Sequence, residues 1–243
     1  MLHIIIDDKD TLYRKGMELF LEQIFRCELG ELVEFLPLVE THVAVADVIV
    51  KNFEPGESYI CNPILRNRKP VSLLIGIYEG DNHPHIGELP LCVNNIVFIN
   101  RAESLGKTRA LIVRGWDNST LKAYRNNRQN CQGCLHRTLS PQQVKVAAHF
   151  YRGYNSEQIA SNLQLNVKTV SAHKHMIMTK FNLYSDCELL HFLNGLKKQN
   201  LMPNLFSECL AGNETFGDSG SLGADFPPRP LGERGFVKGL AFP

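Results

Sequence analysis

The sequence predicts two folded domains of different class, an α/β domain and then an all-α domain of four helices, followed by a disordered tail. Residues 1–117 alternate strand-like and helix-like apolar patterns, which favours a parallel sheet with flanking helices. Residues 138–198 contain helix-start signals at short intervals and show a purely helical pattern. The stretch from 201 to 243 has seven Gly and five Pro without a period, so we expect residues 199–243 to be disordered.

The composition is that of an ordinary globular protein, with 44% hydrophobic and 21% charged residues in a chain of 243. Its apolar runs are far shorter than the ~18 residues that a membrane span needs. The N-terminus MLHIIIDDKD lacks the basic start of a signal peptide. Seven scattered cysteines, an odd number, are typical of reduced thiols. We therefore expect a cytoplasmic protein.

Charge is distributed unevenly behind the net value of +1. Residues 1–117 have 12 basic and 17 acidic side chains, whereas residues 118–137 have four basic and no acidic ones. Residues 138–198 have seven basic and three acidic side chains. A basic stretch beside an acidic one indicates a polyanionic partner, and chance segregation is the alternative.

Apolar runs define the strands that we expect in the first domain, at Leu2–Ile6, Val43–Val50, Val71–Tyr78 and Asn95–Asn100. The first run is rich in β-branched residues and ends at Asp7-Asp8, as a buried parallel strand does. Helical spacing then predicts helices over Leu12–Ile24 and Glu103–Trp116. The stretch 52–70 is rich in Pro, Gly, Asn and Arg, and is expected to be a loop.

Residues 118–137 are polar, basic and rich in Asn and Gln, which predicts a linker. The helices expected after it span about residues 141–152, 156–164, 167–181 and 186–198. Three of them begin with a capping box, formed by Ser140 with Gln143, Asn155 with Gln158, and Ser185 with Glu188. Asn166 is the expected N-cap of the remaining helix, and Gly153 ends the first one.

The second and third of these helices have the layout of a helix-turn-helix. The turn Gln164-Leu165-Asn166 joins them, and Val170, Ile177 and Phe181 share the inner face of the longer helix. The outer face has small and basic residues, which permit close approach to base edges and bonds to phosphates. This arrangement is typical of a recognition helix that enters the major groove of double-stranded DNA.

The stretch Leu139 to Leu183 resembles the LuxR/NarL/FixJ-type helix-turn-helix, and its run Lys168 to Lys174 is most similar to the Rcs capsule-synthesis regulators and their accessory relatives. The matching residues are Leu139-Ser140, Gly153, Ile159-Ala160, Leu163, Thr169-Val170, His173, Ile177 and Lys180. The resemblance covers roughly a quarter of the chain. It departs from the family at Gln142-Gln143, where Arg-Glu is usual, and at Gln158, where Glu is usual; these changes affect an ion pair rather than the fold.

The resemblance implies a bacterial, sequence-specific transcriptional regulator that binds double-stranded DNA as a dimer. The expected DNA contacts are Ser171, Ala172 and His175 to bases, and Lys168, Thr169 and Lys174 to phosphates. His173 is expected to pack beside Val170 and Ile177 and to form a hydrogen bond. The alternative for each expected contact is an ordinary solvated position on the helix.

The last predicted helix, 186–198, has more apolar residues than one face of a small bundle needs. Relatives dimerise through this helix, which implies contacts from Leu189, Leu190 and Leu193 and two half-sites on the DNA. Packing within the domain is the alternative for each leucine. The expected partner is a second copy of the chain or a related regulator.

The first domain resembles the receivers that precede this helix-turn-helix in NarL/FixJ-type proteins, which makes the chain an atypical response regulator. Asp7-Asp8 matches the acidic pair that holds Mg²⁺ in receivers. The resemblance places Asn52 at the phosphoryl acceptor, and an amide cannot form an acyl phosphate. It places Asn100 where Lys is usual, and the strand at 73–76 lacks the usual hydroxyl. We therefore expect a domain without phosphorylation or metal that serves association.

Two other functions remain open. One is a co-regulator that depends on a partner and has little DNA affinity alone. The other is a redox- or metal-responsive regulator built on Cys131 and Cys134, with His136 as a third ligand, although a structural zinc site needs four. Nucleophile-elbow, phosphate-loop and metalloprotease motifs are absent from the sequence, so we expect neither an enzyme, nor a cofactor, nor a small-molecule ligand.

Overall fold

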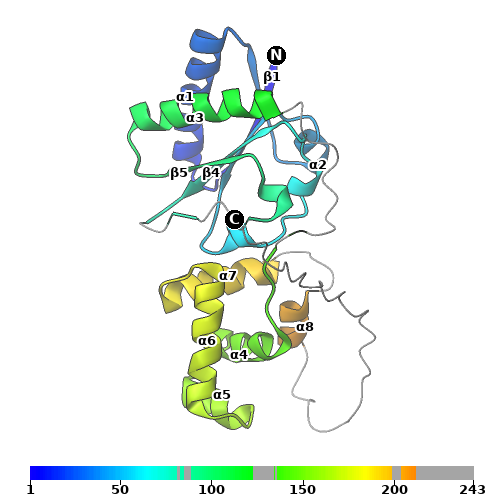
Figure 1. Cartoon of the computed structure of the whole chain (residues 1–243), viewed down its shortest axis with the longest axis vertical. Helices are drawn as coiled ribbons and strands as arrows, with labels where there is room; N and C mark the ends of the chain where they lie inside the picture. The colour runs from blue at the N-terminus through cyan, green and yellow to red at the C-terminus, as the bar shows by residue number, and fades with distance from the viewer. Residues whose placement is uncertain (81–82, 85–88, 123–133, 135, 199–203, 212–243) are drawn as a thin grey trace, which may run out of the picture. The chain divides into compact units, whose positions relative to one another are not determined.

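The computed structural model describes residues 1–80, 83–84, 89–122, 134, 136–198 and 204–211. It confirms the predicted order of an α/β domain followed by a helical domain, and Figure 1 shows the elements of each.

Five parallel strands form one sheet in the order β2-β1-β3-β4-β5. They are β1 (Leu2–Asp7), β2 (Val33–Leu36), β3 (Val48–Asn52), β4 (Leu73–Tyr78) and β5 (Ile96–Asn100). Most residues in β1, β3 and β4 are apolar and buried, because both faces of the central strands are covered. All strands run in the same direction, so their carboxyl ends meet at one edge, where Asp7 pairs in register with Lys51.

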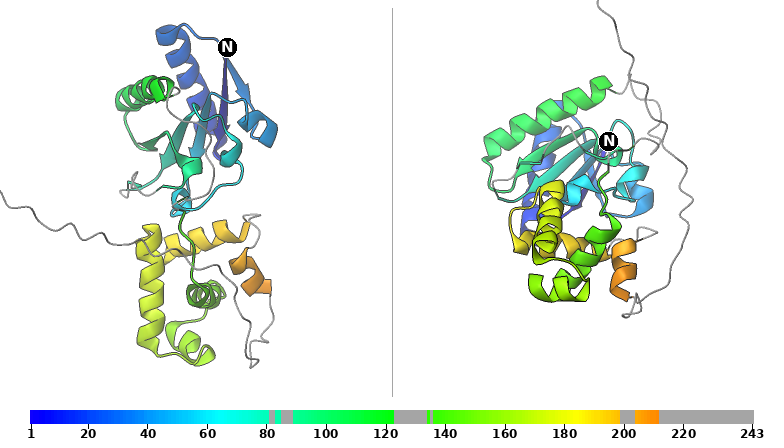
Figure 2. Two further views of the ribbon diagram at one scale, coloured as in Figure 1. Left: turned by 45° about the vertical axis from the view of Figure 1, so that its right-hand side comes forward. Right: turned by 60° about the horizontal axis from the view of Figure 1, so that its bottom comes forward.

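Helices α1 (Thr11–Leu29) and α3 (Leu105–Lys122) cover one face of this sheet. Their apolar sides bury Leu21, Phe25 and Ile112 against the strands. The rings of Phe25 and Trp116 meet edge to face with centroids 5.2 Å apart, so the two helices also pack on each other. Figures 1 and 2 show both helices beside the strands.

The other face is covered by short segments: one turn of helix, α2 (Glu40–Val43), and 3-10 turns at Glu57–Tyr59, Leu65–Asn67 and Leu91–Val93. The buried guanidinium of Arg68 ties these turns together by donating to the carbonyl oxygens of Ser72 at 2.9 Å, Cys92 at 3.1 Å and Asn94. Burial lowers the pKa of Arg68 to about 10, so it stays charged at neutral pH. These hydrogen bonds from Arg68 satisfy buried carbonyl groups that backbone amides would pair with in longer helices.

Three sequence predictions for this domain need correction. The strand expected from Val43 begins at Val48, because the preceding buried residues belong to α2 and a turn. Strand β2 was not predicted, since it has four residues and an exposed Glu34, too short for a periodic signal. Helix α3 continues to Lys122, so residues 118–122 of the predicted linker are helical. Residues 123–133 and 135 lie outside the described residues.

The helical domain contains α4 (Pro141–Tyr151), α5 (Ser156–Asn162), α6 (Val167–Phe181) and α7 (Asp186–Lys198), which confirms the four predicted helices. Both side chains of the capping boxes at Ser140 and Asn155 make their reciprocal hydrogen bonds. Val146, Ile159, Ala160 and Val170 form a core between the first three helices. The rings of Phe181 and Phe192, tilted by 35° with their centroids 4.3 Å apart, join α6 to α7.

A fifth helix, α8 (Leu205–Ala211), lies in the region that we predicted to be a disordered tail, and that prediction is wrong for residues 204–211. Asn204 caps the helix, because its Oδ1 accepts from the amide of Ser207 at 3.0 Å. Phe206 is buried, with its ring edge to face with Tyr151 at 5.8 Å. The Arg152 guanidinium donates to the carbonyls of Cys209 and Leu210 at 3.3 Å. Residues 199–203 and 212–243 lie outside the described residues.

Candidate nucleic-acid interface

Helices α5 and α6 are joined by the tight turn that the sequence predicts. Gln164 has a φ of +53°, and the amide of Leu165 donates to the carbonyl of Ala160 at 2.8 Å. The side chain of Asn166 accepts from the amide of Lys168 at 2.8 Å and so caps α6. In Figure 1, α5 lies at one end of α6 and α7 at the other, which leaves one long side of α6 free of other helices in the domain.

The two faces of α6 differ as predicted. Val170, Ile177 and Phe181 are each 1% exposed and form its inner face. The exposed residues of the opposite side include Lys168, Thr169, Ser171, Ala172 and His175. Because these positions recur at three- and four-residue intervals, they form one strip along the helix, which we call the α6 strip.

Lys174 differs from the other expected DNA contacts. Its ammonium pairs with the carboxylate of Asp186 at 2.7 Å and lies 4.7 Å from the centre of the Phe150 ring. Only 25% of the Lys174 side chain is exposed. The reason lies in helical spacing, since Lys174 is four residues after the buried Val170 and seven before Phe181, and therefore lies away from the α6 strip.

His173 is half-buried, as expected of a packing residue. Its Nδ1 is buried and has no hydrogen-bond partner among the residues that the structure describes, so the hydrogen bond that we predicted is not found at this atom. His175, in contrast, is exposed, and its Nε2 lies 3.5 Å from the hydroxyl of Thr179 at the limit of a hydrogen bond.

The three leucines expected to form a dimer contact on α7 do not share one environment. Leu189 and Leu193 are 1% and 0% exposed, and Leu190 is 36% exposed. Packing of the domain therefore uses the first two, as the alternative interpretation proposed. Leu190 is the one of the three with side-chain surface to offer to a partner.

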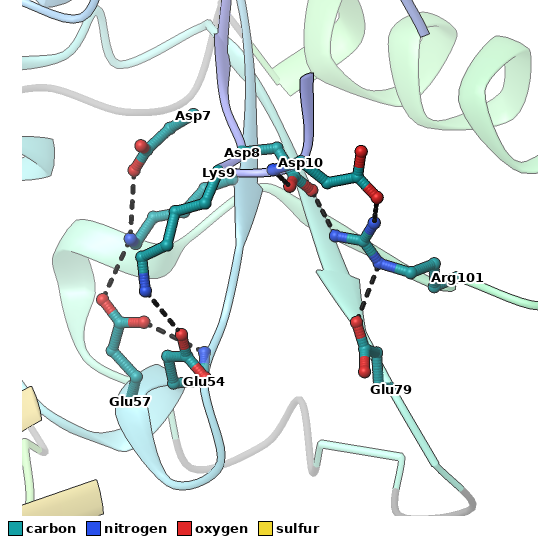
Figure 3. Close-up of polar contacts among 9 residues, drawn as sticks. Asp7, Asp8, Lys9, Asp10, Glu54, Glu57, Glu79 and Arg101 are labelled. Atoms are coloured by element: carbon teal, nitrogen blue, oxygen red, sulfur yellow. Dashed lines mark hydrogen bonds and ion pairs between the residues drawn. The ribbon is translucent and has the colours of Figure 1, made fainter. Parts of the chain in front are cut away.

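At the carboxyl edge of the sheet, acidic side chains are paired with basic ones from other strands (Figure 3). Asp7 ends β1, and its carboxylate lies 3.2 Å from the ammonium of Lys51, the penultimate residue of β3. The same ammonium lies 2.9 Å from Glu57. Burial alone lowers the pKa of Lys51, but Glu57 and Asp7 outweigh it and raise the pKa overall, so the charged form is stabilised.

Arg101, which directly follows β5, neutralises the second aspartate of the acidic pair. The side chain of Asp8 is 1% exposed, and one nitrogen of the Arg101 guanidinium contacts its Oδ2. Other guanidinium nitrogens lie 3.5 Å from Asp10 and 2.9 Å from Glu79. The guanidinium also lies 4.1 Å from the centre of the Tyr13 ring (Figure 3 shows its acidic partners).

This edge does not fit the divalent cation that a receiver-like fold implies. Two protein cations already lie against Asp7, Asp8 and Asp10, and Asn52 ends β3 with an amide in place of a carboxylate. The side chain of Asn100 closes a turn by donating to the carbonyl of Gly80 at 2.6 Å. Sequence reasoning missed Arg101; the available signal was a basic residue one position after the lysine position of the receivers.

The cysteine motif considered for metal or redox chemistry is only partly described. Cys131 lies outside the described residues, while the Sγ of Cys134 accepts from the amide of Leu91 at 3.3 Å. Burial raises the pKa of the nearby Cys92 thiol to about 12, so it is protonated at neutral pH. Within the described ranges there is no group of three or more His, Cys, Asp or Glu placed to hold a metal ion. No helix in those ranges is long and apolar enough to span a membrane.

Comparison with known proteins finds a family match within residues 137–193 and relatives that are similar over most of the chain. Residues 137–193 match the family "Bacterial regulatory proteins, luxR family". The chain is 27% identical over 206 residues to the transcriptional regulatory protein RcsB of Salmonella typhi, covering 80% of this chain and 95% of that protein. It is 44% identical over 54 residues to the transcriptional activator protein BglJ of Escherichia coli K12, covering 22% and 24% of the two chains.

Among solved structures, the two-component response regulator RcsB in complex with DNA matches with a TM-score of 0.46 and 18% identity, covering 79% of this chain and 98% of that one. The similarity to RcsB sequences extends through the α/β domain, whereas the similarity to BglJ covers a segment the size of the helical domain. Residues 137–193 form a luxR-family helix-turn-helix domain, and over 206 residues the chain is similar to the regulator RcsB.

Proposed function

We propose that this chain is a sequence-specific, non-enzymatic DNA-binding transcriptional regulator that acts as a homo- or heterodimer without control by phosphorylation. The α6 strip is the observation that supports it most. A helix whose apolar face is fixed in the core and whose opposite side exposes the small, polar and basic residues of the α6 strip is suited to the major groove. The relatives described as transcriptional regulators share this domain.

Residues of the α6 strip divide into two roles. Ser171, Ala172 and His175 lie along its middle, where short side chains and an imidazole reach base edges. Lys168 and Thr169 lie at the capped N-terminus of α6, where the helix dipole and the free amides also favour a phosphate. Lys174 contacts a phosphate only if it exchanges or shares its partner Asp186.

Control without phosphorylation is supported by the carboxyl edge of the sheet. The amide of Asn52 cannot form an acyl phosphate. The acidic side chains of Asp7 and Asp8 are already paired with Lys51 and Arg101. In this proposal, regulation acts through the amount of the protein and the identity of its dimer partner.

The test of DNA binding is fluorescence anisotropy of the purified chain with labelled random duplexes at ~50 and ~200 mM salt. Lys168 and Lys174 of each protomer would make four phosphate contacts in a dimer. With four contacts, the affinity should fall about a hundredfold between these salt concentrations. A salt dependence near zero, or no binding at the lower concentration, contradicts autonomous DNA binding.

Leu190→Gln is expected to weaken self-association at least about tenfold, because a desolvated leucine at a dimer contact is replaced by a polar side chain. Sedimentation equilibrium measures the dissociation constant, and the melting temperature should stay unchanged, since Leu190 is not part of the core. Leu105→Gln is the matched control, because Leu105 is 69% exposed on α3. An unchanged dissociation constant for Leu190→Gln argues against an α7 dimer contact.

A partner-dependent co-regulator is the second candidate. It is favoured by the burial of Leu189 and Leu193, which leaves α7 little apolar surface for a homodimer. In that case the anisotropy signal appears only after addition of a second regulator, and the chain alone shows weak binding at both salt concentrations.

A further inference from the structure

We infer that the guanidinium of Arg101 takes the place of Mg²⁺ at the acidic edge of the sheet. The acidic side chains there are then neutralised by the protein itself, with or without a metal ion in solution. The inference rests on the proposed function, in which phosphorylation exerts no control. It deepens that proposal by naming the side chain that would keep Mg²⁺, which phosphorylation requires, away from this edge.

The burial of Asp8 is the first step. Its carboxylate is 1% exposed and also accepts from the amide of Asp10 at 2.8 Å, so it is fixed beneath the start of α1. An ionised carboxylate at such a depth needs a positive partner. Arg101 supplies it from the end of β5, which β3 and β4 separate from β1 in the sheet.

The geometry of Arg101 is the second step. A guanidinium has donors that spread in one plane, so a single side chain can lie against several carboxylates at once. Two nitrogens of Arg101 donate hydrogen bonds to Asp8 and Asp10, while its Nε lies 2.9 Å from Glu79 in an ion pair without a hydrogen bond. The guanidinium also lies over the Tyr13 ring, 4.1 Å from its centre. Arg101 is 19% exposed, which limits access of water and ions to the edge.

Lys51, from the neighbouring strand β3, completes the arrangement. Its ammonium is 12% exposed and lies between Asp7 and Glu57. With Lys51 on Asp7 and Arg101 on Asp8, each member of the acidic pair has its own protein cation. A divalent ion at this edge would have to displace a positive side chain and approach a second one.

The experiment compares the full chain with Arg101→Met, Asp8→Asn and the double variant, by thermal unfolding with ~10 mM MgCl₂ or with NaCl of matched ionic strength. The melting temperature of the unchanged protein should be the same in both salts. Arg101→Met should lower it by about 10 °C, because Asp8 loses its partner. Mg²⁺ should then raise it by at least about 4 °C. The double variant should recover part of the loss and ignore Mg²⁺, since the buried charge is gone.

Controls separate a specific cation from general effects. Lys15→Met removes an exposed ion pair with Glu18 and should change neither the melting temperature nor the Mg²⁺ response. Arg101→Lys should fold and remain indifferent to Mg²⁺. If Arg101→Met is unfolded without metal, circular dichroism should show helix content returning on addition of Mg²⁺.

The inference is overturned if Mg²⁺ raises the melting temperature of the unchanged protein. It is also overturned if Mg²⁺ does not stabilise the Arg101→Met variant. The proposed lack of phosphorylation is read separately by mass spectrometry after incubation with acetyl phosphate. Stoichiometric labelling of residues 1–117 contradicts the proposed function, whereas an unlabelled protein whose Arg101→Met variant ignores Mg²⁺ contradicts only the inference.

Discussion

Phe206→Ala is expected to lower the free energy of unfolding of the helical domain by about 3–5 kcal/mol, the range for truncation of a buried phenylalanine. Phe206 is 3% exposed and packs edge to face on Tyr151 of α4. A helix of seven residues has no stability of its own, so α8 depends on this anchor. Its removal should also release the Arg152 guanidinium from the carbonyls of Cys209 and Leu210.

Urea unfolding measures this change, with hydrogen exchange of residues 205–211 as the local readout. Leu205→Ala is the matched control, because Leu205 precedes Phe206 in the same helix and is 50% exposed. It should change the free energy of unfolding by less than about 0.5 kcal/mol. Equal effects of the two substitutions would mean that α8 is not docked on α4.

The second large effect concerns sequence preference. His175→Ala and Ser171→Val should change which base pairs are selected at one position of each half-site, at about 1–3 kcal/mol for each base pair that is no longer recognised. Lys168→Gln should act differently: it should weaken binding to every duplex alike and reduce the slope of log affinity against log salt by about one for each phosphate left without its lysine.

Selection from random duplexes with each variant distinguishes these two classes of residue. His191→Ala is the control, since His191 is an exposed histidine outside the recognition helix. Unchanged affinity and unchanged preference in His175→Ala would show that the α6 strip does not face the bases. A changed preference in Lys168→Gln would move that residue from the phosphate group to the base readers.

Local signals explain why the helical domain was predictable. Ser140, Asn155 and Asn166 cap three helices, and the caps fix helix starts independently of tertiary contacts. The spacing of Val170, Ile177 and Phe181 defines the inner face of α6 in the same way. What the sequence could not show was α8, because residues 205–211 are helical through contacts with Tyr151 and Arg152, far away along the chain.

The α/β domain was predictable in class but less so in detail. Buried central strands give strong apolar runs, whereas β2 is an edge strand with a weak pattern and α2 is a single turn. Arg101 and Lys51 are tens of residues away from Asp8 and Asp7 along the chain, and only the parallel register brings them to one edge. For the same reason the pairing of Lys174 with Asp186, on the next helix, was not expected from the α6 sequence alone.

The association of the receiver-like domain remains a prediction. Leu12 and Leu19 on α1 are 84% and 59% exposed and lie one heptad apart, so they share a side of that helix. They are the first positions at which a contact between domains of two protomers should be sought.

Selection and sequencing of random duplexes bound by the purified chain alone tests the central claim most directly. The α6 strip and a dimer together predict that the bound pool converges on two half-sites about one helical turn of DNA, roughly 34 Å, apart. Enrichment of such a sequence, abolished when Ser171 and His175 are both replaced, is the expected result. A bound pool with no enriched sequence at either salt concentration would contradict an autonomous sequence-specific regulator.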